Sequence, residues 1–213
     1  MTAKRAALLL VALLLASAAP AKKQTVGAPT VVPNEKEAAG TPYRIEGEWI
    51  RYETGGILIQ VRCLTEEERV GFFRQRTRLK TDPFPPSALY PEGFTIFELS
   101  FLNGSKQGFQ FSPGMAAIVR GSRAELEPYD LGSLYSYFLQ LLEGDDAAVE
   151  AALDAIYTRT VLLNPGERTT QLLIFEGLSA RTKKFTLNLD YLLFGSTTQD
   201  LAFPFRVLRE ESR

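Results

Sequence analysis

The sequence predicts a mainly β fold of antiparallel strands, with a short helix at about residues 65–77 and a helical insertion at about 131–157. Two patterns indicate this class: short segments alternate apolar and polar residues, and turn-forming residues separate them. The composition agrees, because 45% of the 213 residues are hydrophobic, which is typical of a globular protein with a sizeable core. Many short strands with turns between them favour an antiparallel sandwich or barrel.

The N-terminal residues have the pattern of an export signal. Lys4 and Arg5 precede an apolar run at Ala6–Ala16, and Ala16-Ser17-Ala18 offers small residues for cleavage. The apolar run is much shorter than the roughly 20 residues of a membrane-spanning helix. We therefore expect a signal peptide at 1–18, a periplasmic or secreted protein, and no transmembrane segment after cleavage. A signal that is kept as an anchor is the alternative.

Three further segments complete the expected domain organisation. Residues 19–43 contain Pro20, Pro29, Pro33 and Pro42 in a polar, Ala-rich stretch, which predicts a flexible linker. Residues 44–208 form a single β domain that includes the helical insertion, and 209–213 form a tail.

The strands are expected where alternation is clearest and where turns bound it. The stretch KFTLNLDYLLFG, for example, puts Phe185, Leu187 and Leu189 on one face of a strand. Proline cannot donate a ladder hydrogen bond, so Pro204 predicts an edge strand at 201–207. Clear strands are expected at 57–64, 94–103, 184–195 and 201–207, and less regular ones at 45–52, 109–111, 115–120, 158–163 and 171–176. Turns are expected at Asn103-Gly104, Ser112-Pro113-Gly114 and Asn164-Pro165-Gly166.

The first helix carries its own start and stop signals. Thr65 with Glu68 three residues later forms a capping box, and acidic residues fill the first turn. Arg74, Arg76 and Arg78 follow at the other end, where the helix dipole favours positive charge. This charge pattern has a sufficient structural explanation.

The insertion at about 131–157 predicts a helical hairpin whose apolar residues must be covered. Asp145 or Asp146 caps its second helix. The apolar positions are Leu131, Leu134, Tyr135, Phe138, Leu141 and Leu142 in the first helix, and Val149, Leu153 and Ile156 in the second.

The stretch QLLIFE is apolar on both faces of its expected strand. Leu172 and Ile174 lie on one face, and Leu173 and Phe175 on the other. Such a strand is typical of the centre of a sheet that is covered on both sides. The hairpin at 131–157 is expected to cover the second face. If these four residues are exposed instead, they form the candidate interaction surface of the protein.

Composition limits the available chemistry. The chain contains no histidine, which removes histidine-based triads and the usual zinc sites, and its net charge of −1 gives no reason to expect a nucleic-acid partner. The single cysteine, Cys63, rules out an internal disulfide and is expected to be buried and inert. We find no calcium-loop or nucleotide-loop spacing, so no metal, cofactor or catalytic residue is predicted.

Three stretches together resemble the immunoglobulin-type sandwiches of bacterial exported proteins. These are FELSFLNGSKQGFQFSP, VLLNPGERTTQLLIFEG and KFTLNLDYLLFG, and the resemblance covers roughly residues 45–208. It implies an immunoglobulin-like β-sandwich in an extracytoplasmic setting with a binding or assembly role. Two features depart from such domains, namely the missing lipoprotein cysteine and the helical insertion.

Three functions remain open at this point. The first is a non-enzymatic protein-binding or structural module of the cell envelope, for example an accessory subunit of a secretion, pilus or transport assembly, with another envelope protein as its partner. The second is a small-ligand or glycan-binding domain that uses Phe84, Tyr90 and Phe94 around the proline-rich loop. The third is a carboxylate-dependent hydrolase, which needs two acids facing each other in a cleft.

Overall fold

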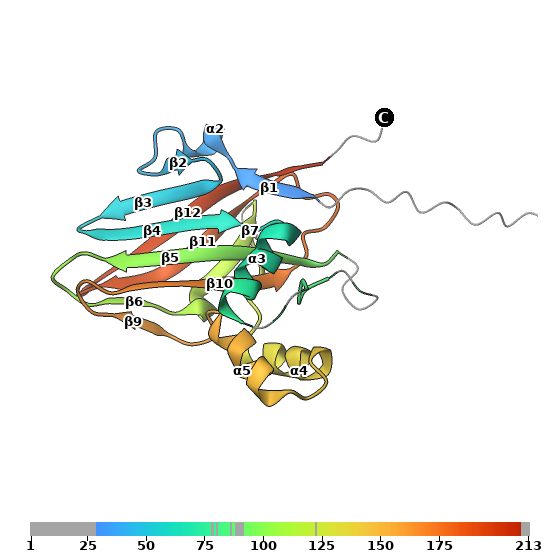
Figure 1. Cartoon of the computed structure of the whole chain (residues 1–213). Helices are drawn as coiled ribbons and strands as arrows, with labels where there is room; N and C mark the ends of the chain where they lie inside the picture. The colour runs from blue at the N-terminus through green and yellow to red at the C-terminus, as the bar shows by residue number, and fades with distance from the viewer. Residues whose placement is uncertain are drawn as a thin grey trace, which may run out of the picture. The chain divides into compact units, whose positions relative to one another are not determined.

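The computed structural model describes residues 29–209 except 78, 80, 86, 88–91 and 122. The predicted signal peptide, the first part of the predicted linker (19–28), most of the predicted tail (210–213) and Tyr90 lie outside the described residues. The described chain forms two antiparallel sheets and several helices (Figure 1).

The larger sheet has seven strands in the described part of the chain. One side of its long strand β11 (Lys184–Phe194) pairs with β12 (Thr197–Leu208), and the other side pairs with two shorter strands in succession. The remaining strands are β1 (Thr30–Pro33), β6 (Phe109–Phe111), β7 (Ala116–Arg120), β8 (Arg123–Leu126) and β9 (Val161–Leu163). A 3-10 turn, η1 (Pro113–Met115), separates β6 from β7, and both pair with β11.

The smaller sheet has five strands in the order β10-β5-β4-β3-β2. They are β2 (Arg44–Glu46), β3 (Trp49–Thr54), β4 (Ile57–Cys63), β5 (Phe94–Asn103) and β10 (Arg168–Glu176). The single strand expected at 45–52 is therefore wrong. Gly47, with a positive φ of 63°, turns the chain between β2 and β3 and makes a hairpin there.

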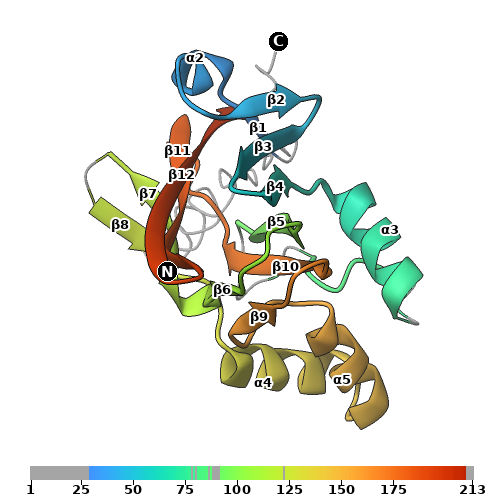
Figure 2. The same cartoon turned by 90° about the vertical axis from the view of Figure 1, so that its left-hand side faces the viewer.

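The inner faces of the two sheets share one hydrophobic core. Phe97 of β5, for example, lies with its ring 5.1 Å from that of Phe205 of β12. Figure 2 shows β11 and β12 on one side of β4 and β5, with the helix α3 (Glu66–Arg76) on the other side. The alternation in the sequence is thereby explained, since alternate residues of β4, β5 and β11 enter this core.

A second core lies between the outer face of the five-stranded sheet and three helices. Ile96, Leu172 and Ile174 point outward from the sheet and pack with Phe73 of α3 and Phe138 of the insertion. The insertion forms α4 (Leu131–Leu141) and α5 (Asp146–Asp154), capped by Asp130 and Asp145, so the predicted helical hairpin is confirmed. The capping box of Thr65 and Glu68 at the start of α3 is confirmed as well.

Part of the predicted linker belongs to the fold. β1 pairs with the end of β12, and the short helix α2 (Glu35–Ala38) follows it directly. The linker prediction is therefore wrong from Thr30 onward. The four residues of β1 carry too little alternation to predict a strand, and their structure depends on the pairing with β12.

Pro204 does not lie in an edge strand, because β12 pairs with β11 on one side and with β1 on the other. The proline nitrogen still has no ladder hydrogen bond to make, because β1 ends beside it. β1 ends at Pro33, and the next residue, Asn34, turns its carbonyl to the N–H groups of Glu37 and Ala38 in α2. The Asn34 N–H donates to the Pro204 carbonyl at 2.9 Å, and no second ladder bond is required at the proline nitrogen.

Two of the predicted turns connect the sheets instead of forming hairpins. Asn103-Gly104 leads from β5 in the smaller sheet to β6 in the larger one, and Asn164-Pro165-Gly166 leads from β9 back to β10. The two turns meet, because the Gly166 N–H donates to the Asn103 carbonyl and the Asn103 N–H donates to that of Glu167. The positions of these turns were predicted correctly. The sequence did not show that they join strands of different sheets.

The strand β10 is an edge strand of its sheet, whereas the sequence favoured a central one. Its outer edge is nevertheless covered. Leu172 donates its N–H to Ala155 and accepts from Tyr157, and the Ile174 carbonyl accepts from Tyr129. The chain segments on either side of the insertion thus take the place of a neighbouring strand.

Gly71 offers a direct test of the α3 assignment. It lies inside the helix, and a Cβ added there would meet nothing within 4 Å. We expect Gly71→Ala to raise the free energy of unfolding by about 0.5–1 kcal/mol, because alanine favours the helix. Urea denaturation measures this change.

The matched control is Gly177→Ala. Here the added Cβ would collide with the backbone carbonyls of Glu92 and Gly93, just before β5. We expect the free energy of unfolding of this variant to fall by roughly 1–3 kcal/mol. A lower free energy of unfolding for Gly71→Ala would contradict the assignment of α3.

No helix in the described residues has the length and apolar character needed to cross a membrane.

Candidate functional site

The four residues proposed from the sequence as an interaction surface are not accessible. Leu172, Leu173, Ile174 and Phe175 are each at most 1% exposed. Leu173 and Phe175 belong to the core between the sheets, and Leu172 and Ile174 to the core beneath the helices. The expectation that the hairpin covers the second face is correct, and the QLLIFE surface is withdrawn as a docking site.

The aromatic residues of the proline-rich loop do not form an open ligand surface either. Phe84 is fully buried, with its ring stacked on Tyr137 at 5.5 Å and close to Phe138. Phe94 is half-buried, and its ring lies 5.1 Å from that of Phe84. The loop therefore supplies part of the core under α4.

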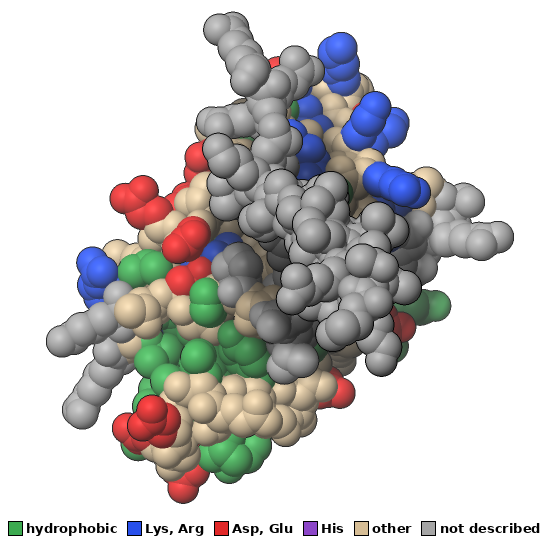
Figure 3. Space-filling view, turned by 90° about the vertical axis from the view of Figure 1, so that its right-hand side faces the viewer, with side chains coloured by type: hydrophobic (Ala, Val, Ile, Leu, Met, Phe, Trp, Pro, Cys, Tyr) green, Lys and Arg blue, Asp and Glu red, His purple; other side chains and the backbone are tan. Residues whose placement is uncertain are grey.

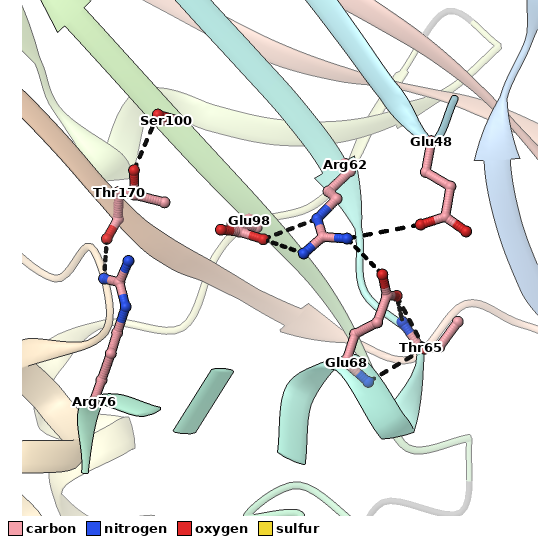
Figure 4. A network of polar contacts seen from close by, with 8 residues as sticks. All are labelled: Glu48, Arg62, Thr65, Glu68, Arg76, Glu98, Ser100 and Thr170. Carbon is pink, nitrogen blue, oxygen red and sulfur yellow. Dashed lines mark hydrogen bonds and ion pairs between the residues drawn. The ribbon is translucent and has the colours of Figure 1, made fainter. Parts of the chain in front are cut away.

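A network of polar contacts lies where α3 meets the sheet (Figure 4). Arg62 of β4 donates to the carboxylate of Glu98 on β5 at 2.7 and 2.8 Å, and to that of Glu68 on α3 at 2.5 Å. Glu48 lies 3.7 Å from the same guanidinium, which also lies over the ring of Trp49. Arg62 thus connects two strands, a hairpin and the start of α3.

The far end of α3 is held in a similar way. Arg76 donates to the backbone carbonyl of Thr170 on β10, and its guanidinium lies 4.2 Å from the ring centre of Phe72 (Figure 4). The Thr170 hydroxyl donates in turn to that of Ser100 at 3.0 Å. The arginines at the end of α3 were predicted to serve the helix dipole, and Arg76 serves the contact with the sheet as well.

The network contains a pair of carboxyl groups with opposite pKa shifts. The nearby charge of Glu68, with partial burial, raises the pKa of Glu48 above its usual value. Burial also acts to raise the pKa of Glu68, but hydrogen bonds from Thr65 and the charge of Arg62 outweigh it and lower that pKa. Such a split is typical of acid–base pairs.

A structural role accounts for the same carboxylates. Glu68 accepts from the Thr65 N–H at 2.8 Å and from Arg62, and the Glu48 side chain is 60% exposed. Three hollows in the described part of the chain are lined by other residues. Within the described ranges, no three His, Cys, Asp or Glu side chains are grouped to hold a metal ion.

Cys63 ends β4 and is half-buried. Burial of its thiol raises the pKa to about 12. Because the thiolate is the reactive form, this cysteine is a poor nucleophile at neutral pH.

The exposed apolar residues of the insertion form the remaining candidate. Leu134 and Phe138 are the buried residues of α4, whereas Tyr135 is 42% exposed and Leu139 is 36% exposed. Leu131, half-buried, continues the line of Tyr135 and Leu139 at spacings of four residues. We call these three residues the hairpin surface.

The hairpin surface corrects the sequence analysis of α4. One stripe was expected to be buried, but α4 has two apolar sides, and the sheet covers only one of them. Leu141, in the last turn, is exposed as well. Figure 3 shows hydrophobic side chains gathered over the lower part of this face of the molecule. The surplus of apolar residues in 131–142 was the signal in the sequence that pointed to this surface.

Comparison with models of known protein families and with curated proteins finds no match for this chain.

Proposed function

We propose that this chain is an exported, non-enzymatic protein-binding module of the bacterial cell envelope, and that it contacts its partner through the hairpin surface. The observation that carries the proposal is the exposure of Tyr135 and Leu139 beside an otherwise well-covered core. Adjacent exposed apolar side chains of this size are typical of protein–protein contact sites.

The position of the surface supports the same role. α4 and α5 pack against each other, and their buried sides rest on the five-stranded sheet and the Phe84 loop. A partner would therefore meet a helix that is already held in place, so that little conformational entropy is lost on binding. The N-terminal signal pattern supports a partner outside the cytoplasm.

A photo-crosslinking amino acid at position 135 tests the proposal in the organism that encodes the chain. We expect a crosslinked adduct with one envelope protein, which excess unlabelled full-length chain competes away. Leu139→Ser should reduce the adduct about tenfold, because it removes a large apolar contact near the probe. Mass spectrometry and immunoblotting measure the adduct.

The matched control places the same probe at Tyr191. This tyrosine is 66% exposed but lies on β11 of the other sheet, so it should give no such adduct. An adduct of equal yield from both positions, or only self-linked chains at position 135, would contradict the proposal.

We further propose that the two sheets form an immunoglobulin-like sandwich. Support comes from the shared core between the antiparallel sheets and from the four connections that cross between them in the described chain, β1 to β2, β5 to β6, β9 to β10 and β10 to β11. An experimental structure in which these strand pairs are hairpins within one sheet would contradict it.

A further inference from the structure

The helical insertion differs in charge from the rest of the chain. Residues 126–158 contain seven acidic residues and no Lys or Arg. The whole chain has 24 Lys and Arg against 25 Asp and Glu, so the rest of it has 24 against 18. A surface of one sign favours a partner of the opposite sign.

Three of these carboxylates follow one side of α5. Asp146, Glu150 and Asp154 are exposed and lie four residues apart, so they are neighbours along the helix. We call them the acidic line. The residues of the hairpin surface have the same spacing on α4. Each helix of the hairpin thus carries one exposed line, apolar on α4 and acidic on α5.

The two lines border the same hollow, which has a volume of about 370 Å³. Leu131 of the hairpin surface lines it together with Glu150 and Asp154 of the acidic line. Leu153 of α5 adds a further apolar side chain to the wall. Figure 3 shows Asp and Glu side chains at the rim of the apolar lower part of this face. A ligand in the hollow therefore meets apolar groups and carboxylates side by side.

The acidic line has no cationic partner within the described residues. None of its three carboxylates takes part in an ion pair there. Arg159 also lines the hollow, but its charge can balance only one of the three. Like charges at a spacing of four residues repel one another, and a cationic ligand would remove this repulsion.

We propose that the partner presents a basic amphipathic helix of about three turns to this hairpin. Its apolar side packs on the hairpin surface, and its Lys or Arg side chains lie along the acidic line. This inference rests on the proposed function and adds the chemistry of the partner to it.

The shape of the hairpin favours a helix as the ligand. α4 has 11 residues and is therefore about 16 Å long, which three turns of a second helix match. An amphipathic helix that binds a groove uses apolar anchors three and four residues apart, and the hairpin surface offers its contacts at this spacing.

Binding of a designed peptide to the full chain tests this chemistry. The probe is a fluorescent peptide of Leu and Lys, about 18 residues long, whose Leu residues repeat with the period of a helix. We expect saturable binding by fluorescence anisotropy at low ionic strength. A peptide with Glu in place of Lys, and a scrambled Leu–Lys peptide without an apolar side, should each bind at least about tenfold more weakly.

Two variants separate the charged contact from the apolar one. Glu150→Gln combined with Asp154→Asn should weaken binding of the Leu–Lys peptide by about tenfold at low salt and by less than about twofold in about 1 M salt, where charges are screened. Leu139→Ser should weaken it about tenfold at both salt concentrations. Thermal unfolding checks that both variants fold.

The matched control is Glu66→Gln combined with Glu67→Gln, which removes the same charge from exposed positions on α3. It should change the affinity by less than about twofold. The proposal is overturned if this control loses as much affinity as the variant of the acidic line, or if the Glu or scrambled peptide binds as tightly as the Leu–Lys peptide. A peptide-free chain whose dimer is broken by Leu139→Ser would assign the surface to a second copy and would overturn it as well.

The crosslinking at position 135 distinguishes this inference from the proposed function. An adduct that Glu150→Gln combined with Asp154→Asn reduces by about threefold or more supports both. An adduct that this variant leaves unchanged supports the proposed function and overturns the basic helix. The absence of any adduct contradicts the proposed function, whatever the peptides bind.

Discussion

Replacing Asp82 by alanine should lower the free energy of unfolding by about 3–5 kcal/mol, because it leaves the charge of Arg69 buried and unpaired. The Arg69 guanidinium of α3 donates to Asp82 Oδ1 at 3.2 Å and to Oδ2 at 2.5 Å. The two side chains are only 10% and 6% exposed. Asp82 Oδ1 also accepts from the Phe84 N–H at 3.0 Å, so the change loosens the loop under α3 and α4. Chemical denaturation measures the loss.

Two controls separate the buried charge from the loss of a side chain. Arg69→Met combined with Asp82→Ala should recover much of the stability, because it removes both partners of the pair. Glu37→Ala breaks the exposed pair with Lys184 and should cost less than about 1 kcal/mol. A loss at Asp82 no larger than that at Glu37 would show that the ion pair contributes little.

Replacing Asn103 by alanine should cost about 3–4 kcal/mol, at roughly 1 kcal/mol for each of four lost hydrogen bonds. Asn103 is fully buried at the end of β5. Its amide nitrogen donates to the carbonyls of Gln107 and Leu163 at 2.7 and 2.9 Å, and its amide oxygen accepts from the N–H and hydroxyl of Ser105. The side chain thus joins the connections between the two sheets. Thermal and urea unfolding measure the effect.

Asn164→Ala is the matched control, since this asparagine lies in the neighbouring turn but is exposed. It loses one side-chain hydrogen bond, to Glu167 at 3.2 Å, and should cost less than about 1 kcal/mol. Similar losses at both positions would contradict a special role for Asn103.

The elements predicted most accurately are those whose signals are local. The capping box of Thr65 and Glu68 and the caps of α4 and α5 involve residues within one helical turn, so the sequence alone determines them. β4, β5 and β11 were predicted from their alternation, because one face of each enters the core between the sheets.

The candidate site was predicted less well, because exposure depends on what covers each face. QLLIFE is apolar on both sides for the reason proposed, and the helices cover it. The exposed apolar residues are Tyr135 and Leu139, which lie on the hairpin that covers the sheet. Periodicity identifies an apolar stripe, but it does not show which part of a wide stripe packs against the rest of the protein.

The sequence by itself determined the β class, the helical hairpin and the turn positions. It also excluded sites that depend on histidine. Only the tertiary structure decided that residues 30–38 belong to the fold, that β10 lies at an edge, and that Arg62, Arg69 and Arg76 hold α3 in place. The physical reason is the separation of the partners along the chain. Arg62 and Glu98 lie 36 residues apart, and Arg76 and Thr170 lie 94 apart. Contacts of this kind form only when distant strands and helices pack together.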